Sequence, residues 1–141
     1  MLSGEKFGPD EGQCHGYPGH PEVELALVKL YRATGEKRYL EVSKYFVEQR
    51  GVGRITSSRE EKGEKYRQIF PEFKDYSPAY SQSHLPVREQ KTAEGHAVRA
   101  VYLYCAMADL AYEYRDESLL DAADLVDNMV KKKMLLNIMH L

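Results

Sequence analysis

The sequence lacks several features that would assign it to a particular class of protein. Its two cysteines, Cys14 and Cys105, are too few for the disulfide framework of a small secreted domain. The 20 basic and 22 acidic residues nearly cancel, so no charged surface for nucleic acid or an anionic membrane is expected. No apolar run approaches the roughly 20 residues of a membrane-spanning helix, and the first residues do not resemble a signal peptide. We therefore expect a reduced, cytoplasmic protein without nucleic-acid or membrane partners.

The chain also lacks the short motifs that usually identify catalysis. It contains no glycine-rich phosphate loop, no nucleophile with a base at a recognisable spacing and no evident pair of catalytic carboxylates. Cys14 and His15 lie near His20, but no second cysteine pair stands at a zinc-finger spacing. Cys105 lies in an apolar run and is expected to be a small core residue. The residues alone therefore predict no catalytic group and no metal site in this chain.

The pattern of apolar residues and of glycine and proline along the chain predicts an all-α protein. Residues 1–19 are rich in glycine and proline and are expected to be irregular. Residues 20–51 form a first αα-hairpin: an apolar helix up to Ala33, a stop at Thr34-Gly35, and a second helix over residues 36–50. Residues 52–91 form a long loop, which in a compact domain is usually functional or disordered.

A second αα-hairpin is predicted over residues 92–133, with helices over 92–114 and 118–133. Residues 30–41 align without gaps to residues 110–121, so the turn regions of the two hairpins repeat at an offset of 80 residues. Repeated hairpins must stack to bury their apolar faces. The two hairpins are therefore predicted to be consecutive units of an α/α solenoid or toroid, each with an inner apolar helix and an outer amphipathic one.

Three of the five histidines lie at or near the starts of the predicted inner helices: His20, His84 and His96. In a toroid of hairpins these loops open on one rim, where imidazoles and carboxylates such as Glu22 can hydrogen-bond a polyhydroxyl ligand. A structural alternative stays open, in which His96 bonds backbone groups and His20 substitutes for a helix N-cap. The residues alone thus predict a sugar-type pocket and do not predict catalysis.

Three segments, 16–31, 82–90 and 95–104, resemble glycoside hydrolase family 127, the β-L-arabinofuranosidase family. The resemblance extends to about Met134 and leaves residues 134–141 as a non-family tail. It implies an (α/α)6 toroid and a retaining enzyme that releases L-arabinofuranose. It also implies that His20 and His84 line the sugar subsite, with His96 and Glu22 as further substrate-binding candidates.

The same resemblance implies what this chain would not contain. The family uses a zinc-bound cysteine nucleophile and a glutamate acid/base, and these residues lie in family segments that have no counterpart here. Cys14 and Cys105 stand outside those motifs. We therefore expect an inactive internal fragment, with no cofactor of its own, weak or absent sugar binding, and a homo-oligomer formed through exposed apolar helix faces. Two alternatives stay open: a helical-hairpin protein-interaction module, and one subunit of a split glycosidase.

Overall fold

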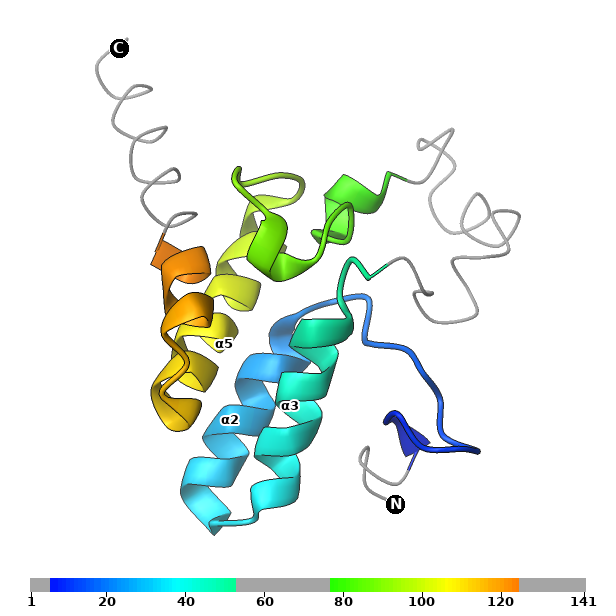
Figure 1. The fold of residues 1–141 in the computed structure, drawn as a ribbon, viewed down its shortest axis with the longest axis vertical. Helices are drawn as coiled ribbons and strands as arrows, with labels where there is room; N and C mark the ends of the chain where they lie inside the picture. Colours follow the sequence, from blue (N-terminus) through cyan, green and yellow to red (C-terminus); the bar gives the residue numbers. More distant parts are fainter. Residues whose placement is uncertain (1–5, 53–76, 125–141) are drawn as a thin grey trace, which may run out of the picture.

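The computed structural model describes residues 6–52 and 77–124, and the first hairpin lies within the first of these ranges. Helix α2 spans Glu22–Thr34 and helix α3 spans Lys37–Gln49, and the two run antiparallel side by side (Figure 1). Gly35 ends α2 in the left-handed conformation, with φ of 74°, and its N–H donates to the carbonyl of Tyr31. The predicted hairpin and its glycine stop are confirmed.

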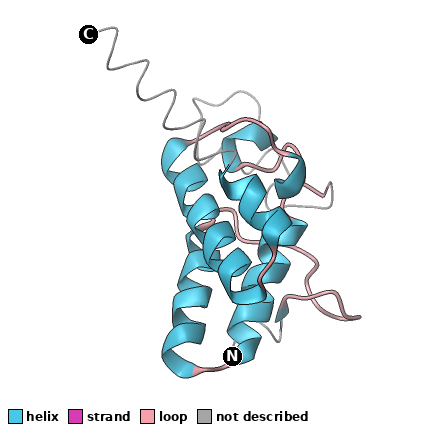
Figure 2. Cartoon of the chain, turned by 60° about the vertical axis from the view of Figure 1, so that its left-hand side comes forward, coloured by secondary structure: helices cyan, strands magenta, loops and turns pink. Residues whose placement is uncertain are grey.

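The second described range is also helical (Figure 2). Two short 3-10 helices, η1 over Pro78–Ser81 and η2 over Val87–Glu89, precede the long helix α5 over Ala97–Tyr114. A further helix begins at residue 117 and is described as far as residue 124. Most of the predicted long loop and the tail over 134–141 lie outside the described residues. The helical content confirms the all-α class.

Two local predictions are wrong. Helix α5 begins at Ala97 and not at Thr92, because Gly95 has a φ of 77° and its backbone lies directly against Ala79. Cys105 is exposed on α5 instead of buried in the core.

Helices α2 and α5 are parallel neighbours. Near their C-terminal ends Arg32 donates to Asp109 at 2.9 Å and to Glu113 at 2.6 Å. Near their N-terminal ends Arg99 donates to the carbonyl of Gly19 at 3.3 Å. The starts of the two inner helices therefore lie at the same end of the molecule, as the sequence predicts.

The core lies between α2, α3, α5 and the last described helix. Its fully buried members include Val28, Val47, Leu103 and Leu110, while Phe46 belongs to a second cluster beside Tyr17. On the surface, Arg88 of η2 pairs with Glu48 at 2.5 Å and with Asp116 at 2.7 Å, which connects η2 with α3 and with the last helix. Among the described helices, none is long and apolar enough to cross a membrane.

Candidate functional site

Five side chains gather where α2 and α5 begin, and we call them the histidine rim: His20, Tyr80, His96, Arg99 and Tyr102. The His20 ring contacts the Tyr102 ring edge-on, with 5.7 Å between their centroids. The His96 ring contacts the Tyr80 ring in the same way, at 5.6 Å. Arg99 lies over Tyr80, with its guanidinium carbon 4.9 Å from the ring centroid. The rim therefore combines hydrogen-bonding groups with flat apolar faces.

The hydrogen bond that His20 accepts fixes which of its nitrogens can donate. Nδ1 of His20 accepts the backbone N–H of Glu22 at 3.3 Å, so the neutral ring carries its proton on Nε2. Partial burial, followed by the charge of Arg99, lowers the pKa of His20 below its usual value, and the carboxylate of Glu22 opposes this shift. At pH 7 the His20 ring is therefore neutral and offers one N–H donor.

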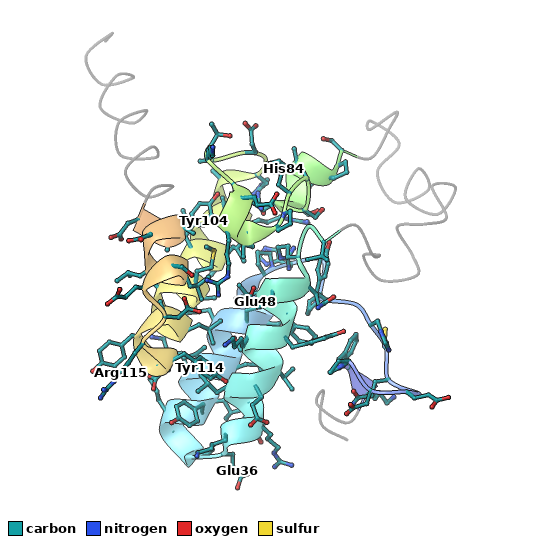
Figure 3. The ribbon with its side chains drawn as sticks, viewed as in Figure 1. Glu36, Glu48, His84, Tyr104, Tyr114 and Arg115 are labelled. Carbon is teal, nitrogen blue, oxygen red and sulfur yellow. The ribbon has the colours of Figure 1, made fainter. Side chains whose placement is uncertain are left out.

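His84 lies in a tightly held loop between η1 and η2 (Figure 3). The side chain of Gln90 closes this loop by donating to the carbonyls of Gln82 and Leu85, both at 2.8 Å. Gln82 has a φ of 56°, an uncommon left-handed conformation for a non-glycine residue. The side-chain nitrogen of Gln82, Nε2, donates to the carbonyl of Glu94 at 2.9 Å, which connects the loop to the start of α5.

Two buried polar atoms in this loop have no hydrogen-bond partner within the described ranges: Oε1 of Gln82 and Nδ1 of His84. Buried polar atoms usually have a partner, so each such atom requires an explanation. Both belong to the loop that carries His84.

Beneath the rim lies a buried ion pair that the sequence analysis missed. Arg50 donates to Oε1 of Glu24 at 2.8 Å, and both side chains are fully buried. Burial raises the pKa of the Glu24 carboxyl, and the adjacent Arg50 guanidinium opposes that change. Arg50 also donates to the carbonyls of Pro18 and Ser81. No local sequence signal identifies Arg50, because these partners lie 26 to 32 residues away.

The four predicted site residues thus have different surroundings. His20 and His96 lie at one end, connected through Arg99 and two tyrosines, and His84 occupies the neighbouring loop. Glu22 is exposed beside His20. Arg99, Tyr80 and Gln82 were not predicted. The sequence signals that could have identified the first two are their positions, since Arg99 lies three residues after His96 and Tyr80 lies four residues before His84.

The zinc that the family resemblance implies has no fitting set of ligands in this part of the chain. Across residues 6–52 and 77–124, no three histidine, cysteine or acidic side chains come together as a metal site. Cys14 is exposed on the N-terminal segment, and Cys105 is exposed on α5. No step of the function proposed below involves a metal.

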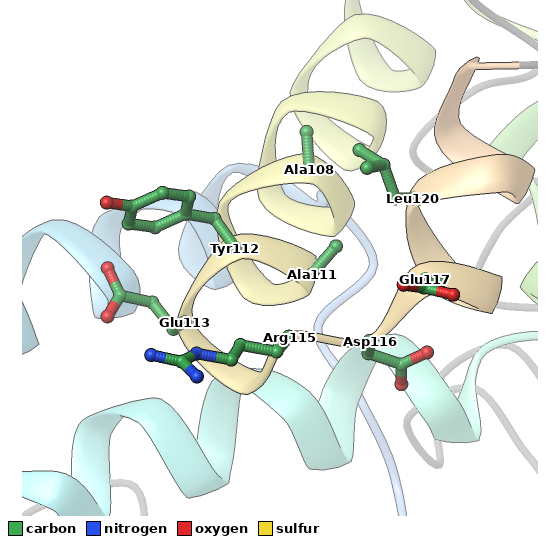
Figure 4. A pocket seen from close by; sticks show the side chains of 8 residues that line it. All are labelled: Ala108, Ala111, Tyr112, Glu113, Arg115, Asp116, Glu117 and Leu120. Atoms are coloured by element: carbon green, nitrogen blue, oxygen red, sulfur yellow. The ribbon is translucent and has the colours of Figure 1, made fainter.

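A separate open hollow of about 700 Å³ lies between the end of α5 and the following helix (Figure 4). It is lined by Ala108, Ala111, Tyr112, Glu113, Arg115, Asp116, Glu117 and Leu120. Because α5 has 18 residues, its two ends are about 27 Å apart, so this hollow is remote from His96. It contains none of the predicted site residues, and the histidine rim is the better candidate site.

Comparison with known proteins gives one consistent family. The family described as β-L-arabinofuranosidase, GH127 catalytic domain, matches residues 3–136. A non-reducing end β-L-arabinofuranosidase from Bifidobacterium longum subsp. longum is 44% identical over 129 residues, which cover 91% of this chain and 20% of that protein.

Solved structures agree with this match. The crystal structure of a GH127 β-L-arabinofuranosidase from Geobacillus stearothermophilus T6 superposes with a TM-score of 0.76 and 44% identity, covering 91% of this chain and 20% of that one. Another GH127 β-arabinofuranosidase superposes with a TM-score of 0.70 and 39% identity, covering 90% and 17%. The chain therefore spans about a fifth of the length of these relatives.

Proposed function

The chain belongs to the family of GH127 β-L-arabinofuranosidase catalytic domains, and we propose that it provides part of the arabinofuranoside-binding rim of such a domain. The observation that carries this proposal is the gathering of His20, His96 and Arg99 with two tyrosines at the shared end of α2 and α5. The ligand class is a neutral sugar of the L-arabinofuranoside type, because the relatives are β-L-arabinofuranosidases.

The chemistry of the rim suits a neutral, hydroxylated ligand. His20 offers a neutral N–H donor, and the guanidinium of Arg99 adds further donors beside the Tyr80 ring. Tyr80 and Tyr102 are each partly exposed, and their rings add apolar surface against which the C–H groups of a sugar can pack. Binding by hydrogen bonds and ring contacts requires no charge on the ligand.

Titration of the 141-residue chain with methyl β-L-arabinofuranoside, followed by NMR of the histidine rings, tests this proposal. We expect saturable shifts of His20 and His96, with binding weakened about tenfold in His20→Ala, since one lost hydrogen bond is worth about 1.4 kcal/mol. His15→Ala is the matched control, because His15 is exposed on the N-terminal segment. Unchanged ring signals at saturating sugar would contradict the proposal.

We further propose that this chain alone does not hydrolyse arabinofuranosides. The support is chemical: within residues 6–52 and 77–124 no three cysteine, histidine or acidic side chains come together as a group that could hold the zinc implied by the family resemblance. Incubation of the pure protein with an aryl β-L-arabinofuranoside should release no phenol above the buffer rate. Sustained turnover that follows the protein through purification would refute this statement.

We also propose that the chain forms a homo-oligomer, and the support is an exposed apolar stripe on α5. Val98 and Val101 are about half exposed, at 54% and 48%, and Tyr112 is 78% exposed. Cys105 and Ala108, also exposed, continue the stripe at spacings of three and four residues. A patch of this kind on the isolated chain favours self-association. Light scattering should give more than the 16.2 kDa monomer mass, and Val101→Lys should restore the monomer.

A further inference from the structure

Arg50 connects the segments that lead to two of the rim histidines. One of its guanidinium nitrogens, Nη1, donates to the carbonyl of Ser81 at 3.0 Å, three residues before His84. The other, Nη2, donates to the carbonyl of Pro18 at 2.8 Å, two residues before His20. A single buried side chain thus bonds to two backbone segments that lie more than 60 residues apart in the sequence.

The surroundings of Arg50 leave its guanidinium little freedom. Glu24 of α2 accepts from Nη2 at 2.8 Å, and the Tyr17 ring lies under the guanidinium, 4.6 Å from its carbon. Ser43 donates to the backbone carbonyl of Glu24 at 2.8 Å, which connects the same turn of α2 to α3. The planar, forked guanidinium can serve these partners together, whereas the single ammonium of lysine cannot.

The residue after Arg50 fixes the same loop from the other side of His84. Gly51 has a φ of 81°, and a Cβ built on it would overlap the carbonyl group of Leu85. Arg50 therefore bonds to Ser81, and the missing side chain of Gly51 lets the backbone of Leu85 approach closely; Ser81 and Leu85 flank His84. Through Gln82, whose side chain bonds to the carbonyl of Glu94, the same loop reaches the start of α5 and His96.

We propose that Arg50 is a positioning residue for the histidine rim, which holds the backbone before His20 and around His84 in one fixed arrangement. The binding readout of this inference rests on the function proposed above, whereas its structural readout does not. Stability alone is a poor explanation, because a buried ion pair costs about as much to desolvate as its attraction returns.

The test compares Arg50→Lys with the matched variant Arg88→Lys in the 141-residue chain. Both changes keep the positive charge and remove a forked arginine that joins separate elements. Arg88, however, donates to the side chains of Glu48, Asp116 and Ser118 and not to backbone carbonyls beside the rim histidines. We expect Arg50→Lys to weaken methyl β-L-arabinofuranoside binding at least tenfold and to shift the His20 and His84 ring signals. Arg88→Lys should change neither. Both are measured well below their melting temperatures, at equal helix content.

Each outcome has a distinct meaning. If Arg50→Lys binds sugar as the unaltered chain does and leaves the histidine signals in place, Arg50 is not a positioning residue, although the sugar site stands. If the unaltered chain binds no sugar, the proposed function fails, and the histidine shifts still decide the role of Arg50.

A measurement on the unaltered chain covers the case in which Arg50→Lys does not fold. A guanidinium held by these partners should give separate, slowly exchanging Nη–H signals in nitrogen-15 NMR. Averaged signals from a freely rotating Arg50 would overturn the inference.

Discussion

Removal of the Arg50 charge should leave Glu24 as an unpaired charge in the interior. Both side chains are fully buried, and Nε of Arg50 and Oε2 of Glu24 already have no hydrogen-bond partner within the described residues. In Arg50→Met the remaining Glu24 carboxylate keeps its desolvation cost and loses its counter-charge. The double variant Glu24→Met/Arg50→Met removes both charges and retains side chains of similar length.

The structure sets the expected magnitudes. Loss of one partner from a buried ion pair costs about 3–5 kcal/mol, a large part of the about 5–15 kcal/mol that keeps a typical domain folded. In the double variant no charge is stranded, and the main remaining cost is that the carbonyls of Ser81 and Pro18 lose their donor. This loss is about 1–3 kcal/mol in total, because the bond to Pro18 is only partly buried. The double variant should therefore be more stable than Arg50→Met by about 2 kcal/mol.

Urea unfolding followed by circular dichroism measures both variants, and pH provides an independent check. Burial raises the folded-state pKa of Glu24, so its contribution to stability falls as the pH rises from the unfolded-state pKa of about 4.5 to the folded-state pKa. Without Arg50 this loss should be larger, and Arg50→Met should be less stable at pH 7 than at pH 5. Equal stability of the single and double variants, or no such pH effect, would refute the reasoning.

Three further predictions concern packing, backbone and surface charge. Leu103→Ala should lower the free energy of unfolding by about 2–5 kcal/mol, whereas Leu85→Ala, at a 42% exposed position, should stay within about 0.5 kcal/mol; similar losses would contradict the assigned core. Gly95→Ala should lose more than 1 kcal/mol in thermal unfolding, because φ is 77° there; an unchanged melting temperature would exclude that conformation. Arg88 lowers the pKa of Asp116, so stability should fall as the pH drops below about 4, and Asp116→Asn should flatten that loss; an equally steep loss in the variant would exclude this pair.

The first hairpin could be predicted because its signals are local. Gly35 ends α2 by adopting a positive φ, and the apolar spacing on either side of it is helical. The shared direction of α2 and α5 also followed from the repeat, since equivalent helices of stacked hairpins run the same way. The repeat therefore predicts that His20 and His96 lie at the same end, as the bond from Arg99 to Gly19 confirms.

The errors arose where tertiary contacts override local patterns. Ala93 and Glu94 are good helix formers, but Gly95 lies against Ala79 with a positive φ, and the helix begins only at Ala97. Cys105 lies in an apolar run whose spacing cannot distinguish a buried face from an exposed apolar stripe. In both cases the outcome depends on which residues pack against the position, and this packing exists only in the folded chain.

Of the histidine rim, only His20 and His96 were predicted, because the residues that bond to their segments lie far away in the sequence. Arg99 reaches Gly19 over 80 residues, and Arg50 reaches Ser81 over 31. These bonds run from side chains to backbone carbonyls, so no pairing of residue types reveals them. The arrangement of the rim therefore depends on where these backbone carbonyls lie more than on which residues carry them. Substitution of Arg50 should therefore disturb His20 and His84 together, and these two responses should be coupled.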